Sequence, residues 1–130
     1  MARARIYLPA GAAQVEALLE GALPAGAPGF AVASGASEER EHQAWVLAAD
    51  AAHVLVEGQA RAVVISGDVD VQDVDPQPAD DPTECVTTAP LTVRAVVSLH
   101  VDEDPGSGVE DLLWFDVTEL TEVAKLVARR

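Results

Sequence analysis

The chain has 130 residues, with eight basic against 22 acidic side chains and a formal net charge of −14 at pH 7. This length allows one domain with its own hydrophobic core, so we expect a single globular domain over residues 1–130. The acidic excess excludes nucleic acids and anionic membrane surfaces as partners, because both attract basic proteins. A basic partner, or solubility in a crowded cytoplasm, fits this charge better.

Two further features predict a cytoplasmic protein. Cys85 is the only cysteine, which excludes an internal disulfide and with it a small secreted fold held by disulfides. No stretch approaches the roughly 18 apolar residues that span a bilayer. Pro9, Gln14 and Glu16 also interrupt the apolar run that a signal peptide would need near residue 1. We therefore expect no membrane partner.

The first part of the chain is predicted to form a strand, a helix and a second strand. Polar and apolar residues alternate over 3–9, which predicts a strand. Helical spacing of apolar residues predicts a helix over 12–20, with Gly21 at its natural end. Proline and glycine predict a loop over 23–29, and a short strand is expected over 29–34.

A long helix is predicted from the N-cap Ser37 to about Glu57, with an acidic first turn that suits the helix dipole. Its alanines leave little bulk, so it can pack closely, and we predict that it is the central helix of the fold. Asp50, His53 and Glu57 form a narrow polar stripe. His42 and His53 lie about 16 Å apart along the axis, so they cannot share a metal ion, and we expect both at the surface or its boundary.

The second half of the chain is predicted to consist mainly of strands. The predicted strands are residues 61–70, 84–88, 91–103 and 112–116. Asp116 and Glu119 match the spacing of a helix-capping box, which predicts that the last helix begins there. Within that helix, Leu120, Val123 and Val127 are expected to face inward.

These elements predict an α+β or α/β sandwich, in which a mixed sheet of about five strands packs against about three helices. A ferredoxin-like core with additions is the alternative. Acidic loops are predicted near residues 71–82 and 102–110. The first is rich in Asp, but it lacks the Gly and the Glu that an EF-hand loop needs at fixed positions. We therefore expect no metal site and no cofactor.

The segment VVSLHVDED, residues 96–104, holds the candidate site. Strand alternation places Ser98, His100 and Asp102 on one face, where a carboxylate can orient an imidazole, as it does for many catalytic or metal-bound histidines. Glu103 is a further carboxylate. Polar side chains where a strand edge meets water are the alternative interpretation. No motif places a nucleophile or a metal ligand beside them, so His100, Asp102 and Glu103 are candidates rather than assigned catalytic residues.

Several segments of the chain match a known family in order. These segments are RIYLP (5–9), the alanine-rich second helix, VVISGDV (63–69), SLHVDE (98–103) and LLWFDVTEL (112–120). Through them the chain resembles a family of small, uncharacterised actinobacterial proteins classed as a domain of unknown function. The resemblance covers nearly the whole chain. It implies a bacterial cytoplasmic protein, and it implies no activity, cofactor or catalytic residue.

The leading functional hypothesis is a non-catalytic cytoplasmic accessory or protein-interaction module, which binds another protein or itself. The absence of a convergent acid, base and nucleophile motivates it. The runner-up is a small enzyme or ligand-binding domain that uses the His100 and Asp102 pair with a carboxylate such as Glu103. A third hypothesis is an acidic mimic that occupies a basic partner through residues 68–84.

Overall fold

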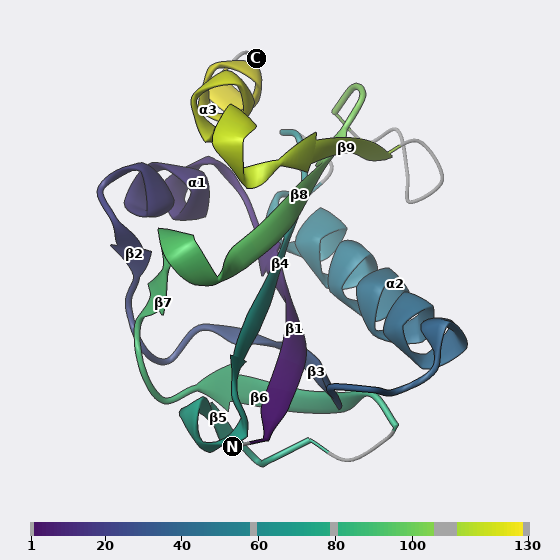
Figure 1. Cartoon of the computed structure of the whole chain (residues 1–130). Helices are drawn as coiled ribbons and strands as arrows, with labels where there is room; N and C mark the ends of the chain where they lie inside the picture. Colours follow the sequence, from purple (N-terminus) through teal and green to yellow (C-terminus); the bar gives the residue numbers. More distant parts are fainter. Residues whose placement is uncertain (1, 58–59, 79–80, 106–111, 129–130) are drawn as a thin grey trace.

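The computed structural model describes residues 2–57, 60–78, 81–105 and 112–128 (Figure 1). Its helices and strands are, in chain order, β1 (Arg3–Ala10), α1 (Ala12–Leu19), β2 (Ala22–Leu23), β3 (Pro28–Ala33), α2 (Glu38–Leu55), β4 (Val63–Asp70), β5 (Val74–Asp75), β6 (Thr83–Thr87), β7 (Leu91–Thr92), β8 (Val96–Asp102), β9 (Leu112–Asp116) and α3 (Leu120–Ala128). Short 3-10 helices η1 (Val71–Asp73), η2 (Val93–Ala95) and η4 (Val117–Glu119) link some of them.

Over the described residues, seven strands form one antiparallel sheet in the order β5-β6-β3-β1-β4-β8-β9, and β2 pairs with β7 apart from it. The predicted sandwich of a sheet and helices is confirmed, but the prediction of a mixed sheet of about five strands is wrong, because the sheet is larger and antiparallel. The ferredoxin-like alternative is also wrong, because that core keeps its first two strands parallel with another strand between them, whereas β1 pairs directly and antiparallel with β3, the next strand of the sheet. Residue periodicity predicts strands but not their direction or order, which explains the error.

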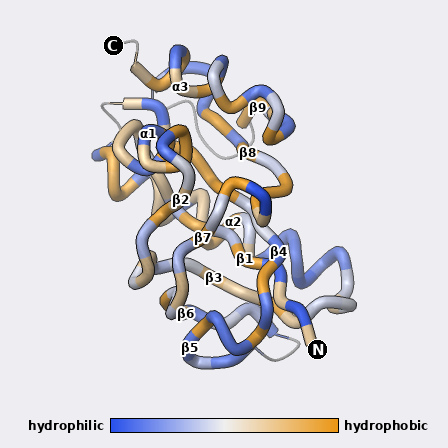
Figure 2. The backbone as a smooth tube through the Cα atoms, turned by 60° about the vertical axis from the view of Figure 1, so that its left-hand side comes forward, coloured by the Kyte–Doolittle hydropathy of each residue, from blue (hydrophilic) through white to orange (hydrophobic). Residues whose placement is uncertain are grey.

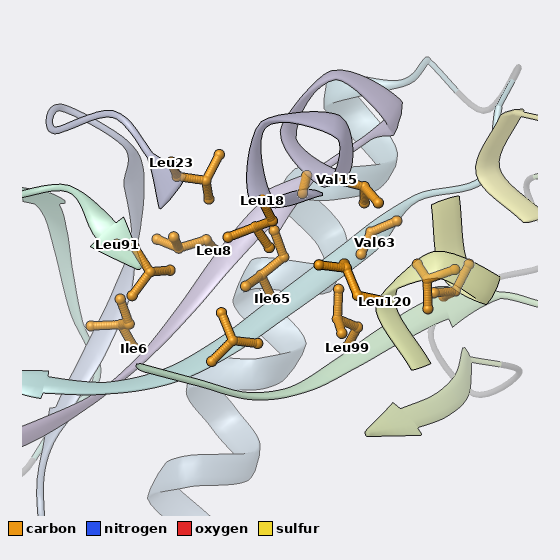
Figure 3. Close-up of a cluster of buried hydrophobic side chains, with 14 of the residues drawn as sticks. Ile6, Leu8, Val15, Leu18, Leu23, Val63, Ile65, Leu91, Leu99 and Leu120 are labelled. Atoms are coloured by element: carbon orange, nitrogen blue, oxygen red, sulfur yellow. The ribbon is translucent and has the colours of Figure 1, made fainter. Parts of the chain in front are cut away.

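The two faces of the sheet are covered differently. The helices α1 and α3 pack together over one face, and α2 lies alone over the other (Figure 1). Strand alternation sends Ile6 and Leu8 of β1 toward α1 and α3, where they join the larger hydrophobic cluster (Figure 3). Tyr7, between them in the chain, points toward α2 and joins the smaller cluster.

The helix α2 forms an outer layer, so the prediction that it is the central helix is wrong. Its buried face consists of Ala44, Ala48, Ala49 and Ala52, which bring the helix close to the sheet as expected. The large apolar side chains on its other side are exposed, including Val54 at 77%. Composition alone made the helix look apolar around most of its circumference, because small and large apolar residues lie on opposite sides.

The predicted helix ends agree with the structure. The Ser37 side chain accepts a hydrogen bond from the backbone N–H of Arg40 at 3.3 Å and so caps α2. Asp116 and Glu119 form the predicted capping box at η4, which leads directly into α3. In α3, hydrophobic and hydrophilic residues alternate around the helix (Figure 2), and Leu120, Val123 and Val127 are buried as expected.

The two predicted acidic loops are shorter than expected. The segment 71–82 begins with η1 and then β5, which pairs with β6 at the edge of the sheet. The segment 102–110 begins inside β8, because Asp102 is the last residue of that strand and is fully buried. Residues 106–110 lie outside the described part of the chain.

Candidate functional site

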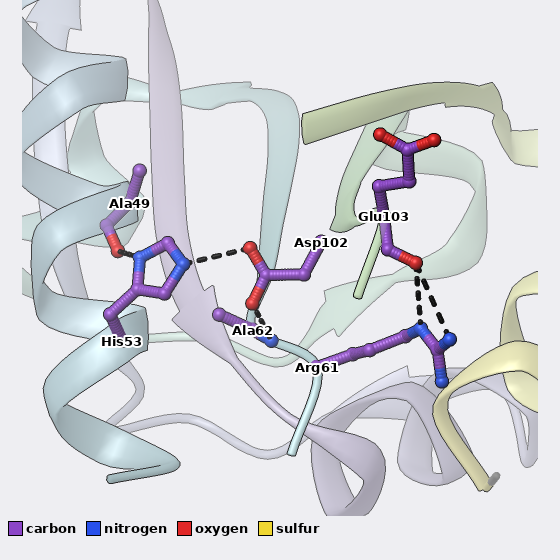
Figure 4. A network of polar contacts seen from close by, with 6 residues as sticks. All are labelled: Ala49, His53, Arg61, Ala62, Asp102 and Glu103. Carbon is purple, nitrogen blue, oxygen red and sulfur yellow. Dashed lines mark hydrogen bonds and ion pairs between the residues drawn. The ribbon is translucent and has the colours of Figure 1, made fainter. Parts of the chain in front are cut away.

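The carboxylate of Asp102 ties the end of β8 to α2. Its Oδ2 accepts a hydrogen bond from the backbone N–H of Ala62 at 2.9 Å, and its Oδ1 lies 2.7 Å from Nε2 of His53 (Figure 4). The backbone N–H of Asp102 in turn donates to the carbonyl oxygen of Ala62 at 3.0 Å. A side chain with no exposed surface is thus satisfied by a backbone group and an imidazole, as a buried charge requires.

Oxygen atoms hold the imidazole of His53 on both sides. Its Nδ1 lies 2.7 Å from the carbonyl oxygen of Ala49, one turn earlier in α2, and a carbonyl only accepts, so Nδ1 carries a proton. Nε2 faces Oδ1 of Asp102 at the same distance. Contacts at both ring nitrogens thus fix the orientation of the ring.

The structure separates the three candidate residues. His100 lies on the same face of β8 as Asp102, as predicted, but its ring packs edge-on against Trp45, with ring centroids 5.3 Å apart. The side chain of Glu103 is exposed, and its backbone carbonyl accepts hydrogen bonds from the Arg61 guanidinium at 3.3 Å. Asp102 thus orients the imidazole of His53, and His100 belongs to a different part of the same face.

That part of the face contains a pocket of about 420 Å³, which lies between the first half of α2 and the sheet. The strands β1, β4 and β8 supply Tyr7, Ser66, Ser98 and His100. The helix α2 supplies Glu41, His42 and Trp45, and Arg5 and Leu112 complete the lining. We call this the Trp45–His100 pocket.

Strand register explains why polar groups gather beneath α2. Tyr7 lies directly opposite Ser66 on β4, and Ser66 lies directly opposite Ser98 on β8. The three side chains therefore form one row across the sheet, and alternation sends all of them toward α2. Each is at most 6% exposed. A row of buried polar side chains is unusual for a sheet face that a helix covers, since hydrophobic residues normally fill that space.

Three residues that line this pocket each have a buried polar atom without a hydrogen-bond partner within the protein. These atoms are Nε1 of Trp45, Oγ of Ser66 and Nδ1 of His100, and no other buried side-chain atom of the described residues lacks one. An unpaired buried polar group costs about 1–3 kcal/mol, so native proteins keep few of them. All three belong to residues that line the same pocket, which marks it as the polar site of the molecule.

The pocket carries balanced charge. The guanidinium of Arg5 binds Asp68 with two hydrogen bonds, at 2.5 Å and 3.2 Å, and the carboxylate of Glu41 lies on the helix side. Burial lowers the pKa of His100, which favours a neutral imidazole. Burial, followed by the charge of Glu41, raises the pKa of Tyr7 and keeps its phenol protonated.

The acidic segment 68–84 is partly engaged within the protein. Asp68 binds Arg5, and Asp81 forms an ion pair with Arg40 of α2. The side chain of Asp70 accepts a hydrogen bond from the backbone N–H of Gln72 and so caps η1. These contacts turn part of the segment toward the domain itself, which weakens its use as a free acidic surface for a basic partner.

Other features of the described residues offer fewer groups for binding or catalysis than the Trp45–His100 pocket does. They contain no group of three or more His, Cys, Asp or Glu side chains that could hold a metal ion, and none of their helices is long and apolar enough to cross a membrane. A larger pocket of about 510 Å³ is lined mainly by apolar residues such as Leu23, Phe30 and Val54. The three unpaired polar atoms all lie outside it, so we place the candidate site in the Trp45–His100 pocket.

Sequence reasoning identified His100 but missed its partners. The sequence analysis does not single out Trp45, Tyr7 or Ser66 as site residues. A usable signal is present in Ser66, a polar residue that directly follows the apolar run AVVI at residues 62–65 within a predicted strand. His53 was likewise placed at the boundary of the protein, where its side chain is 20% exposed, without its contact to Asp102.

Comparison with known proteins identifies a family whose function is unknown. Residues 4–110 match the profile described as a family of unknown function, DUF6912. Searches of the curated proteins and of the solved structures found no match. The match supports the resemblance found in the sequence, and it leaves the function to be argued from the site.

Proposed function

The chain belongs to the family of unknown function DUF6912, and we propose that it is a non-catalytic domain that binds a small polar molecule in the Trp45–His100 pocket. One observation carries this proposal: three of the residues that line one pocket each have a buried polar atom without a hydrogen-bond partner. A volume of about 420 Å³ falls within the range of about 300–1,000 Å³ that small-molecule sites occupy. A ligand that satisfies these atoms would recover part of their cost of burial.

Binding fits this geometry better than catalysis does. A nucleophile and its base lie within hydrogen-bond reach of one another, yet Oγ of Ser66 and Nδ1 of His100 both lack such a contact. The histidine that a carboxylate does orient is His53, whose two ring nitrogens are already engaged. We assign this second pair a positioning role, because it fixes α2 two turns beyond Trp45 and so holds one wall of the pocket.

The unpaired atoms are shielded from water, so a ligand reaches them by shifting the side chains above them. The ring of Trp45 stacks on that of His42, with centroids 5.5 Å apart and an interplanar angle of 28°. His42 is exposed on the surface of α2 and can turn away without unpacking the core. Binding should therefore move the Trp45 ring, which makes this residue a natural reporter.

The test follows the indole N–H signal of Trp45 by NMR. The chain has two tryptophans, so Trp114→Phe leaves Trp45 as the only indole. A library of uncharged, anionic and cationic fragments should contain members that shift this signal. Ser66→Ala should weaken their binding, whereas Ser34→Ala, at an exposed serine, should not. If no fragment shifts the signal, or if Ser66→Ala leaves every affinity unchanged, the proposal is wrong.

An accessory role through protein contacts is the second candidate. It is favoured by β9, an edge strand of the sheet on which Leu113 is 39% and Trp114 is 61% exposed, since exposed edges pair readily with other strands. Sedimentation equilibrium tests the simplest case, association of two copies. Trp114→Ser should lower the association constant in that case, and a monomeric wild type at all concentrations would contradict it. A cytoplasmic location likewise stays a prediction from the sequence.

A further inference from the structure

We infer that the ligand is an uncharged planar ring that bears a hydrogen-bond acceptor beside a donor, as an aromatic carboxamide does. This inference rests on the proposed function of the Trp45–His100 pocket and names the chemical class that the pocket selects. Three properties of the lining support it: its aromatic rings, the balance of its charges and the donor or acceptor character of its unpaired atoms.

The walls select a flat ring. Four of the nine residues that line the pocket carry aromatic rings: Tyr7, His42, Trp45 and His100. The rings of Trp45 and His100 meet edge to face at an interplanar angle of 68°. A planar ligand can stack on one of these rings while its edge meets the other, and aromatic pairs of this kind are worth more than their buried area alone.

The charges select against ions of either sign. An anion would face the carboxylate of Glu41, and the one guanidinium of the lining, Arg5, is already held by Asp68. A cation would leave the N–H of Trp45 without an acceptor, because an ammonium or amidinium group only donates. Like charges brought together at a binding site lower affinity strongly.

The unpaired atoms select a ligand that both accepts and donates. Nε1 of Trp45 carries a hydrogen and has no lone pair to offer, so the ligand must present an acceptor there. The hydroxyl of Ser66 accepts and donates, and the unpaired ring nitrogen of His100 does either one according to tautomer. A primary amide offers a carbonyl oxygen and two N–H groups in one plane, and this set matches the needs of all three atoms.

Four matched probes test the inference. Benzamide is the uncharged planar amide, benzoate its anionic analogue, benzamidine its cationic analogue and cyclohexanecarboxamide its non-planar analogue. Dissociation constants are measured on the Trp114→Phe protein from the fluorescence of Trp45 and confirmed by the NMR shift of its indole N–H. The dissociation constant of benzamide should be at least about tenfold lower than those of benzoate and benzamidine. It should also be at least about threefold lower than that of cyclohexanecarboxamide.

Variants and outcomes then separate this inference from the proposed function. Ser66→Ala should raise the dissociation constant of benzamide about fivefold to tenfold, and Ser34→Ala should leave this constant unchanged. If benzoate or benzamidine binds best and Ser66→Ala weakens that binding, the pocket is a binding site but the inferred class is wrong. If benzamide and its three analogues all leave the Trp45 signals unchanged, the inferred ligand class is also wrong. The fragment-library test then shows whether the pocket binds any small molecule.

Discussion

The buried carboxylate of Asp102, which contacts both Ala62 and His53, should contribute more to stability than any other polar side chain on the α2 face. Asp102→Ala removes both acceptor oxygens from a site with no exposed surface. The backbone N–H of Ala62 is then left buried without a partner, at a cost of about 1–3 kcal/mol. His53 is 20% exposed, so water replaces part of its lost contact, and about 1 kcal/mol is added there. We expect a total loss of about 3 kcal/mol.

Asp102→Asn separates the hydrogen bonds from the charge. The amide oxygen of asparagine can accept from the N–H of Ala62, and its amide nitrogen can donate to Nε2 of His53, whose proton sits on Nδ1 facing Ala49. The substituted side chain thus keeps a partner for the N–H of Ala62 and for Nε2 of His53. We expect a loss of less than about 1 kcal/mol for this variant.

Urea unfolding followed by circular dichroism measures both variants, with the slope of the transition checked for constancy. Glu103→Ala is the matched control, because its carboxylate is the exposed neighbour of Asp102 and surface substitutions usually change stability by less than about 0.5 kcal/mol. The reasoning fails if Asp102→Ala matches the control. It also fails if Asp102→Asn is as damaging as Asp102→Ala, since the charge and not the hydrogen bonds would then matter.

Three further predictions concern separate parts of the fold. Gly29→Ala should destabilise the protein by about 1–3 kcal/mol, because an added Cβ would lie 2.4 Å from a methyl group of Leu8 and 2.7 Å from the carbonyl oxygen of Tyr7; calorimetry measures the loss, and an unchanged melting temperature would contradict it. Burial, together with the nearby acid Glu84, raises the pKa of Cys85 to about 11, and its side chain is 4% exposed, so a thiol reagent at neutral pH should label it only as fast as the protein unfolds; rapid labelling of the native protein would refute this. Because burial lowers the pKa of His100 in the folded state, the unfolded chain takes up the proton first as pH falls through about 6.5. As the pH falls from about 7.5 to about 5.5, and until it reaches the pKa of His100 in the folded state, the free energy of unfolding of the wild type should therefore decrease relative to that of His100→Gln. Free energies of unfolding that change in parallel with pH in the two proteins would contradict this prediction.

Period-two alternation predicted the α2 face of β8 correctly. Ser98, His100 and Asp102 all point toward α2, because side chains of a strand alternate whatever the strand pairs with. The alternation pattern does not predict which residues of other elements these side chains contact. His53 is 49 residues from Asp102 in the chain, and the contact depends on where α2 lies over the sheet, which follows from its alanine face meeting the sheet.

The errors in the fold have a similar origin. The edge strand β5 is two residues long, too short to show alternation in a segment rich in Asp and Pro. Its pairing comes from β6, which supplies the ladder partners Val86 and Thr87. Asp102 was expected near solvent because three acids follow one another there, yet its position in the strand places it under α2. Composition shows that the segment is acidic, and the strand register determines which of its residues are buried.

A crystal structure of the protein grown with benzamide tests the central claim most directly. The account predicts that the ring lies against Trp45 and that the amide oxygen stands about 3 Å from Nε1 of that residue, with Ser66 or His100 paired to the same amide. Benzamide bound elsewhere on the surface, with Nε1 of Trp45 still lacking an acceptor, would contradict the account.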